Sequence, residues 1–219
     1  PRPSLAEWRK QLGIGVPIGS TMFCEQSIFG AVGLFMTAYG TTVVAAHQAA
    51  MNFTTVVYMI PLSASMTLTI LVGYEIGAGR NRDAAQYIKL GRWLTFLFEG
   101  SIALLLTQFR YEIADFYTTS MDVRPVLANF LVFAVFLQLA DSIDAPLQGA
   151  LRGYKDVHAT FVLAVISYWV IGLPAGWLIA NYTSVGPYGY WCGLIIGIAF
   201  GAIFLSMRLR AVQKRYQGA

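Results

Sequence analysis

The amino-acid sequence predicts an all-α, polytopic membrane protein built as a bundle of six transmembrane helices. Its composition is 57% hydrophobic and only 12% charged, whereas a soluble domain carries about 25% charged residues. The apolar residues are concentrated in runs close to or above the ~20 residues that cross a hydrocarbon core. The basic residues lie mainly in alternate connections between these runs, which is typical of cytoplasmic loops.

Six apolar runs, each ended by polar or turn-forming residues, define the expected helices. Pro17 lies near the start of the first run, and Pro61, Pro146 and Pro174 lie inside the second, fourth and fifth. Such breakers are tolerated in membranes where neighbouring helices satisfy the freed carbonyl groups. The expected helices cover Leu12–Tyr39, Val44–Val72, Tyr87–Thr107, Val126–Leu151, Ala159–Ala180 and Tyr188–Arg208.

The charge pattern orients this bundle. Of the 15 Lys and Arg residues, only Arg110 and Arg124 lie on one side, and all the others lie on the opposite side. The positive-inside rule therefore predicts that both termini are cytoplasmic. The expected organisation is a cytoplasmic amphipathic linker (1–11), a six-helix transmembrane lobe (12–208) and a basic cytoplasmic tail (209–219). The chain starts without Met, so we expect it to be part of a longer protein.

Aromatic residues are expected at both membrane interfaces, where rings with a polar edge gather. Trp8 and Trp93 belong to the inner interface on this pattern, and Tyr188 and Trp191 to the outer one.

Four acids lie inside the expected spans: Glu25, Glu99, Asp141 and Asp144. A charge at the centre of a membrane helix costs about 2.5–3.5 kcal/mol on insertion scales, so such residues tend to face a wet interior and to be functional. The alternative for each is a neutral, hydrogen-bonded structural group. For Glu99 that alternative is favoured, because Arg92 lies two turns away on a similar face and could pair with it.

Polar side chains recur at helical spacing on three of the expected helices. The first helix carries Glu25. The fourth carries a stripe of Gln138, Asp141, Asp144 and Gln148, and the second carries Gln48, Asn52, Thr55 and Tyr58. We expect the three polar faces to meet around a water-filled pocket. Asp144, Gln48, Asn52 and Gln138 are then candidates for supporting or substrate-contacting roles, although amides and hydroxyls also serve simply to join helices.

Carboxylates that share such a pocket can bind a proton, Na⁺ or an organic cation. Each of these neutralises negative charge that has lost part of its hydration by burial. One pocket holds a driving cation or a cationic cargo, but poorly both together. That mutual exclusion is the basis of antiport, and it requires no further cofactor.

Several stretches, taken in order, resemble the multidrug and toxic compound extrusion (MATE) transporters, NorM-like branch. They are "TTVVAAHQAAMNF", "VGYEIGAGR", "GALRGYKD", "SYWVIGLPAGW" and "PYGYWCGLIIG". The resemblance implies the C-terminal lobe of a twelve-helix exporter in the bacterial inner membrane. It also implies an N-terminal six-helix lobe as partner, cationic amphipathic drugs as cargo, and Na⁺ or H⁺ as the coupling ion.

Within this resemblance, Glu25 and Asp141 match the family's coupling pair and would be the Na⁺ ligands of a sodium-coupled member. Some relatives have a tyrosine one turn before the aspartate, where this chain has Leu137.

Two other functions remain as alternatives. An intramembrane aspartyl protease needs two carboxylates on separate helices, and Asp141 and Asp144 share one helix. A flippase for lipid-linked substrates would be expected to line its cavity with basic residues, and this cavity is acidic. A non-enzymatic transporter with no nucleic-acid partner is therefore the prediction.

Overall fold

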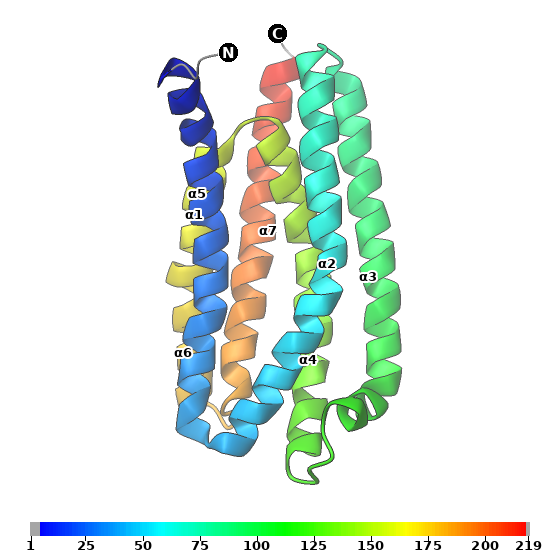
Figure 1. Ribbon diagram of the computed structural model, residues 1–219, viewed down its shortest axis with the longest axis vertical. Coiled ribbons are helices and arrows are strands. Elements are labelled where there is room, and N and C mark those ends of the chain that lie inside the picture. The colour runs from blue at the N-terminus through cyan, green and yellow to red at the C-terminus, as the bar shows by residue number, and fades with distance from the viewer. Residues whose placement is uncertain (1–4, 218–219) are drawn as a thin grey trace.

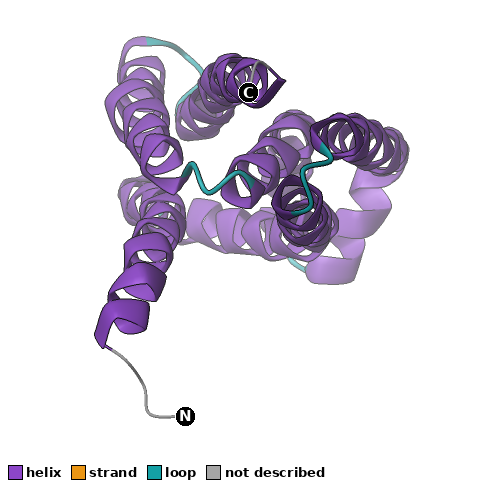
Figure 2. Cartoon of the chain, turned by 90° about the horizontal axis from the view of Figure 1, so that it is seen from above, coloured by secondary structure: helices purple, strands orange, loops and turns teal. Residues whose placement is uncertain are grey.

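The computed structural model describes residues 5–217 as a bundle of long helices (Figure 1). In chain order the elements are α1 (Leu5–Met36), η1 (Thr37–Tyr39), α2 (Thr41–Gly77), α3 (Asn81–Tyr117), α4 (Val123–Gly153), α5 (Val157–Val165), η2 (Ile166–Gly172), α6 (Leu173–Tyr182) and α7 (Tyr188–Gln217). The element η1 is a 3₁₀ turn and η2 is a π-helical segment. Seen from above, the helices are joined by short loops, and the described residues contain no strand (Figure 2). The all-α fold class is confirmed.

Five helical stretches in the described part of the chain are long and apolar enough to cross a membrane, and α5, η2 and α6 together form one of them. The remaining long helix is α1, whose 32 residues include the polar pair Glu25 and Gln26 near the middle. It runs alongside the others in Figure 1 and completes the six-helix bundle. The chain is thus a multi-pass membrane protein.

The helices are longer than expected. The third was predicted over Tyr87–Thr107, but α3 extends from Asn81 to Tyr117. The predicted boundaries were wrong here because they followed the end of the apolar run. A helix satisfies its own backbone hydrogen bonds, so α3 continues to the end of the apolar run and, after a kink at Phe109, into polar residues such as Arg110.

Both ends of the described chain lie at the same end of the bundle, together with the α2–α3 and α4–α5 connections (Figure 1). An even number of passes produces this arrangement. The proposed linker and tail are continuous with the flanking helices, since α1 begins at Leu5 and α7 ends at Gln217. Residues 1–4 and 218–219 of those two segments lie outside the described residues.

The central element is α4, which packs against α2, α3 and α7. Every residue from Asp144 to Leu151 is buried. The contact with α2 is close at Gly149, where an added Cβ would lie 2.7 Å from Ser65 backbone atoms. The Thr69 hydroxyl also donates to the Gly149 carbonyl at 3.0 Å. Small residues let membrane helices approach in this way, and here they hold the polar face of α4 against α2.

A second close contact joins α7 to η2 and α6. Its glycines, here called the glycine seam, are Gly172, Gly176, Gly189, Gly193 and Gly197. Within each of the two segments these glycines are four residues apart, which is the small-xxx-small pattern of tightly packed membrane helices. This seam fixes the position of η2 within the bundle.

Trp191, which was assigned to the outer interface, faces the interior of the bundle and is 0% exposed. Its depth in the membrane stays a prediction. Its indole Nε1 donates to His47 Nδ1 at 3.1 Å, and its ring also packs on Phe130. Burial is possible because the indole N–H has found a partner.

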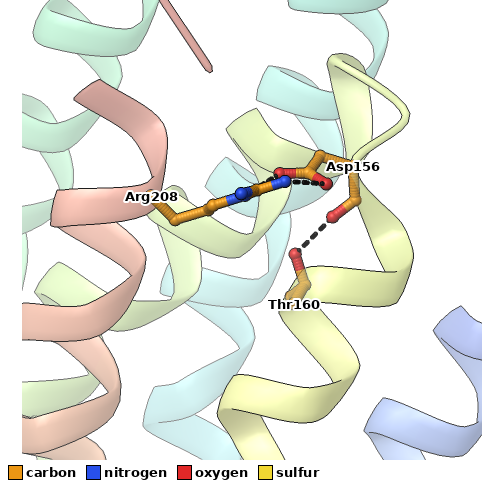
Figure 3. Close-up of polar contacts among 3 residues, drawn as sticks. All are labelled: Asp156, Thr160 and Arg208. Carbon is orange, nitrogen blue, oxygen red and sulfur yellow. Dashed lines mark hydrogen bonds and ion pairs between the residues drawn. The ribbon is translucent and has the colours of Figure 1, made fainter. Parts of the chain in front are cut away.

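A bidentate ion pair ties the start of α5 to α7 (Figure 3). Arg208 Nε donates to Asp156 Oδ2 at 2.6 Å, and its Nη2 donates to Oδ1 at 3.1 Å. The Thr160 hydroxyl donates to the Asp156 carbonyl oxygen at 2.8 Å. Paired, parallel bonds of this kind are among the stronger polar contacts.

Replacing Asp156 by asparagine should therefore lower the thermal stability of the lobe. The expected loss is about 1 kcal/mol, because a charge-assisted bond is weakened but the pair is partly solvated. Thermal midpoints in detergent, read by size-exclusion chromatography of the heated protein, measure it. The matched control is Asp122→Asn, since Asp122 also precedes a helix but is exposed. Equal midpoints for the two variants would contradict the assignment.

Candidate functional site

A small pocket of about 80 Å³ lies between α1, α2 and α4, closed by one residue each of η2 and α7. Its wall contains acidic, other polar and apolar side chains. The lining residues are Glu25, Gln26, Phe29, Met51, Thr54, Thr55, Tyr58, Leu137, Asp141, Asp144, Gln148, Tyr168 and Ile198. Glu25 of α1 thus shares one cavity with Asp141 and Asp144 of α4, and we call this cavity the acidic pocket.

Gln148 joins two of these acids. Its Nε2 donates to Glu25 Oε1 at 2.6 Å and to Asp144 Oδ2 at 2.8 Å. Its Oε1 accepts from Arg152 Nη2 at 3.0 Å. A guanidinium only donates hydrogen bonds, so Arg152 fixes the amide with its NH₂ group facing the carboxylates. One neutral amide therefore bridges α1 to α4.

Asp144 receives a second donor from the π-helical segment. Tyr168, which is 5% exposed, donates its hydroxyl to Asp144 Oδ2 at 3.1 Å. The other oxygen, Oδ1, is buried without a hydrogen-bond partner, as is the Ser167 hydroxyl. A Cβ added at Gly201 would lie 2.9 Å from Oδ1, so a glycine in α7 leaves room for this carboxylate. An unpartnered buried acceptor is costly and is ready to bind a cation or a proton.

Asp141 lines the same pocket one turn before Asp144, and it is only half-buried. No hydrogen bond to its carboxylate occurs among residues 5–217. Leu137 also lines the pocket, at the position where some relatives have a tyrosine. Phenolic oxygens are supplied instead by Tyr58 of α2 and Tyr168 of η2. Although Leu137 has no hydroxyl group, the pocket therefore still contains aromatic hydroxyl groups.

Three expected members of the polar faces do not line the pocket. Gln138 is buried and donates to the Thr54 carbonyl oxygen at 2.8 Å, so it joins α4 to α2. Asn52 accepts from the Tyr117 hydroxyl at 3.0 Å, and Gln48 is exposed on the lobe. None of the three lines the acidic pocket, and a supporting or substrate-contacting role for them stays a prediction. A period of 3.6 assigns a common face but not which part of that face meets a neighbouring helix.

Glu99 lies apart from the other three acids and is buried. It is 0% exposed, and neither carboxylate oxygen has a hydrogen-bond partner in the described structure. The suggested ion pair with Arg92 is not formed among the described residues. Arg92 instead faces a different pocket, formed with α7. Glu99 does not line the acidic pocket.

The chemistry of the acidic pocket is that of oxygen ligands. Carboxylate and phenol oxygens suit hard cations and protons, whereas softer metals prefer nitrogen and sulfur. Among the described residues, no group of three or more His, Cys, Asp or Glu is arranged to hold a metal ion.

Sequence reasoning missed the role of Tyr168. Its signal was the run "ISYWVIG", which forms η2. π-Helical turns concentrate at functional sites, so the structure of this segment points to the site. The sequence does not, because no residue in the segment indicates a change of helical period.

Comparisons with known proteins agree with one another on the family of this chain. A family model described as MatE matches residues 17–178. "Probable multidrug resistance protein NorM" of Bacillus cereus is 51% identical over 215 residues, which are 98% of this chain and 47% of that protein. The protein of the same name from Halalkalibacterium halodurans is 49% identical over 218 residues, 99% of this chain and 47% of that protein. The chain thus spans about half the length of the curated relatives it matches.

Solved structures share the fold. A eukaryotic MATE transporter matches with a TM-score of 0.87 at 17% identity, over 98% of this chain and 51% of that one. A Vibrio cholerae MATE transporter in the bent form matches with a TM-score of 0.83 at 19% identity, over 97% of this chain and 48% of that one.

Proposed function

This chain belongs to the MatE family, and on that premise we propose that it is one lobe of a cation-coupled multidrug efflux antiporter. The observation that carries the proposal is the meeting of Glu25, Asp141 and Asp144 in one pocket inside a membrane bundle. Buried acids in membrane helices are costly and mark ion pathways. An acidic wall attracts cationic cargo and a cationic coupling ion alike.

The comparisons support the transport role. The curated relatives are described as probable multidrug resistance proteins, and the chain spans about half their length. We infer that it is the C-terminal lobe, because its motifs resemble that half of the NorM-like branch. An N-terminal lobe of six helices would complete the transporter, since alternating access needs two lobes that rock around a shared site.

In the proposed mechanism, the acidic pocket has two states of charge. With no cation bound, Glu25 and Asp144 accept hydrogen bonds from the Gln148 amide and so hold α1 against α4. A proton or Na⁺ held by Glu25 and Asp141 competes with the Gln148 amide for the Glu25 carboxylate and weakens that link. The cation then favours one arrangement of the helices, and drug binding after its release favours the other.

We further propose that the protein lies in the bacterial inner membrane with both ends of this lobe in the cytoplasm. Both ends lie at one end of the bundle, and the basic residues gather in the connections at that end. The positive-inside rule assigns such an end to the cytoplasm.

Transport by the protein at its natural length tests the proposal. Reconstituted into liposomes with an imposed Na⁺ or H⁺ gradient, it should move ethidium against its own gradient, and the imposed gradient should dissipate faster when ethidium is present. The control is the same liposomes with no cation gradient. Ethidium movement that ignores both gradients would overturn cation coupling, and no movement of any organic cation would overturn efflux itself.

A further inference from the structure

A second and larger pocket has no part in the proposed transport reaction. Its volume is about 560 Å³, within the range of pockets that hold small-molecule ligands. The walls come from the first turns of α3 and the last turns of α7, with Ser142 and Ile143 of α4 between them. We call it the basic pocket. It lies toward the end of the bundle that holds both chain ends.

Three cations line this pocket: Lys89 and Arg92 from α3 and Arg210 from α7. None of the three forms an ion pair within residues 5–217, and none of the lining residues is acidic. Arg92 is half-buried, and its charge lies near enough to that of Arg210 for the two to repel. Unpaired cations held together at a partly buried site are stabilised by a bound anion.

The rest of the lining is apolar or aromatic. Trp93 is 58% exposed and Phe96 is 40% exposed, both on α3, which is long and apolar enough to cross a membrane. Tryptophan is enriched where hydrocarbon meets the polar headgroups. The pocket therefore combines an anion-binding group of cations with a surface suited to acyl chains.

We propose that the basic pocket binds the headgroup of an anionic phospholipid, with its acyl chains against Trp93 and Phe96. Basic pockets between helices on the cytoplasmic side are a known form of lipid recognition. The pocket has the wrong sign of charge for a cationic drug. Its apolar wall would gain nothing from free phosphate, whereas it would contact the glycerol and acyl parts of a lipid. The lipid would bridge α3 and α7 at an end where few direct contacts join them.

Lipid binding to the protein at its natural length, in detergent, tests this proposal. Dioctanoyl phosphatidylglycerol and dioctanoyl phosphatidylcholine are added separately, and bound lipid is counted by native mass spectrometry. The double variant Arg92→Gln/Arg210→Gln should bind phosphatidylglycerol about thirty-fold more weakly, since each basic residue near an anionic lipid contributes about 1 kcal/mol. Phosphatidylcholine binding should be weak and equal in both proteins.

The matched control is Arg82→Gln/Arg215→Gln, which removes two exposed charges from the same two helices outside the pocket. It should bind phosphatidylglycerol as the unchanged protein does, and Arg92→Lys/Arg210→Lys should retain most of the affinity. Size-exclusion profiles identify any variant that fails to fold. If Arg92→Gln/Arg210→Gln fails to fold, the affinity of Arg92→Lys/Arg210→Lys for phosphatidylglycerol decides the result. Equal losses in both Gln variants, or equal binding of the two lipids, would overturn the proposal. Displacement of phosphatidylglycerol by millimolar inorganic phosphate would also overturn it, in favour of a free-anion site.

Discussion

Asp141→Asn and Glu25→Gln are each expected to abolish cation-coupled efflux while leaving the protein folded. Both substitutions keep the shape of the side chain and remove its charge. At an effective dielectric constant of about 20, a carboxylate ~4 Å from a cation contributes about 4 kcal/mol of attraction. The affinity of the site for its coupling cation should then fall about 100- to 1000-fold in either variant. The measurement is ethidium efflux driven by an imposed Na⁺ or H⁺ gradient in proteoliposomes.

The control for these variants is Asp83→Asn, which makes the same chemical change at a half-exposed acid outside the acidic pocket. Its efflux should equal that of the unchanged protein. Cation-dependent thermal stabilisation gives a second readout, because a ligand that binds only the folded state raises its stability by mass action. Full cation-coupled efflux in both Asp141→Asn and Glu25→Gln would show that the coupling site lies elsewhere.

Asp144→Asn separates two versions of the site. The family resemblance favours Glu25 with Asp141, whereas the hydrogen bonds link Glu25 to Asp144 through Gln148. If Asp144 only orients Glu25, its asparagine variant should weaken cation affinity far less than Asp141→Asn does. If Asp144 is itself a ligand, the two losses should be equal. The same efflux and stabilisation measurements distinguish these outcomes.

The spans and the acids of the site could be predicted from the sequence for a physical reason. In a bilayer a helix must satisfy its own backbone, so apolar length and helical period together determine the spans. An acid inside a span must face protein or water. Those two constraints were enough to place Glu25, Asp141 and Asp144 toward one interior.

The remaining details depend on contacts between helices, which periodicity does not describe. Gln138 faces the α2 backbone instead of the pocket, because its amide donates to the Thr54 carbonyl oxygen. Tyr168 reaches Asp144 from a π-helical turn, where the usual spacing of a helical face no longer applies. Trp191 is buried because His47, far away in the sequence, accepts its N–H.

Replacing Gly193 by leucine should prevent the lobe from folding, and Gly193→Ala should destabilise it severely. A Cβ at this position would lie 2.5 Å from the Gly172 carbonyl oxygen and 2.6 Å from the Gly176 nitrogen. Both are backbone atoms, so no side chain can rotate away, and α7 must separate from η2 and α6. Overpacking of a tight contact costs about 1–3 kcal/mol or more, and membrane helices rely on such packing because lipid supplies little hydrophobic force between them. Thermal midpoints and the yield of monodisperse protein in detergent measure the effect.

The matched control is Gly100→Ala, because a Cβ there would meet nothing within 4 Å. In that helix alanine should be neutral or stabilising, by up to about 1 kcal/mol. The glycine seam also positions η2, so a folded fraction of Gly193→Ala should lose cation affinity in the same way as Tyr168→Phe, which removes the hydroxyl donor to Asp144. Normal stability in Gly193→Ala would refute the close packing. Reduced stability with unchanged cation affinity, together with a clear loss in Tyr168→Phe, would show that the seam supports the fold without setting the geometry of the acidic pocket.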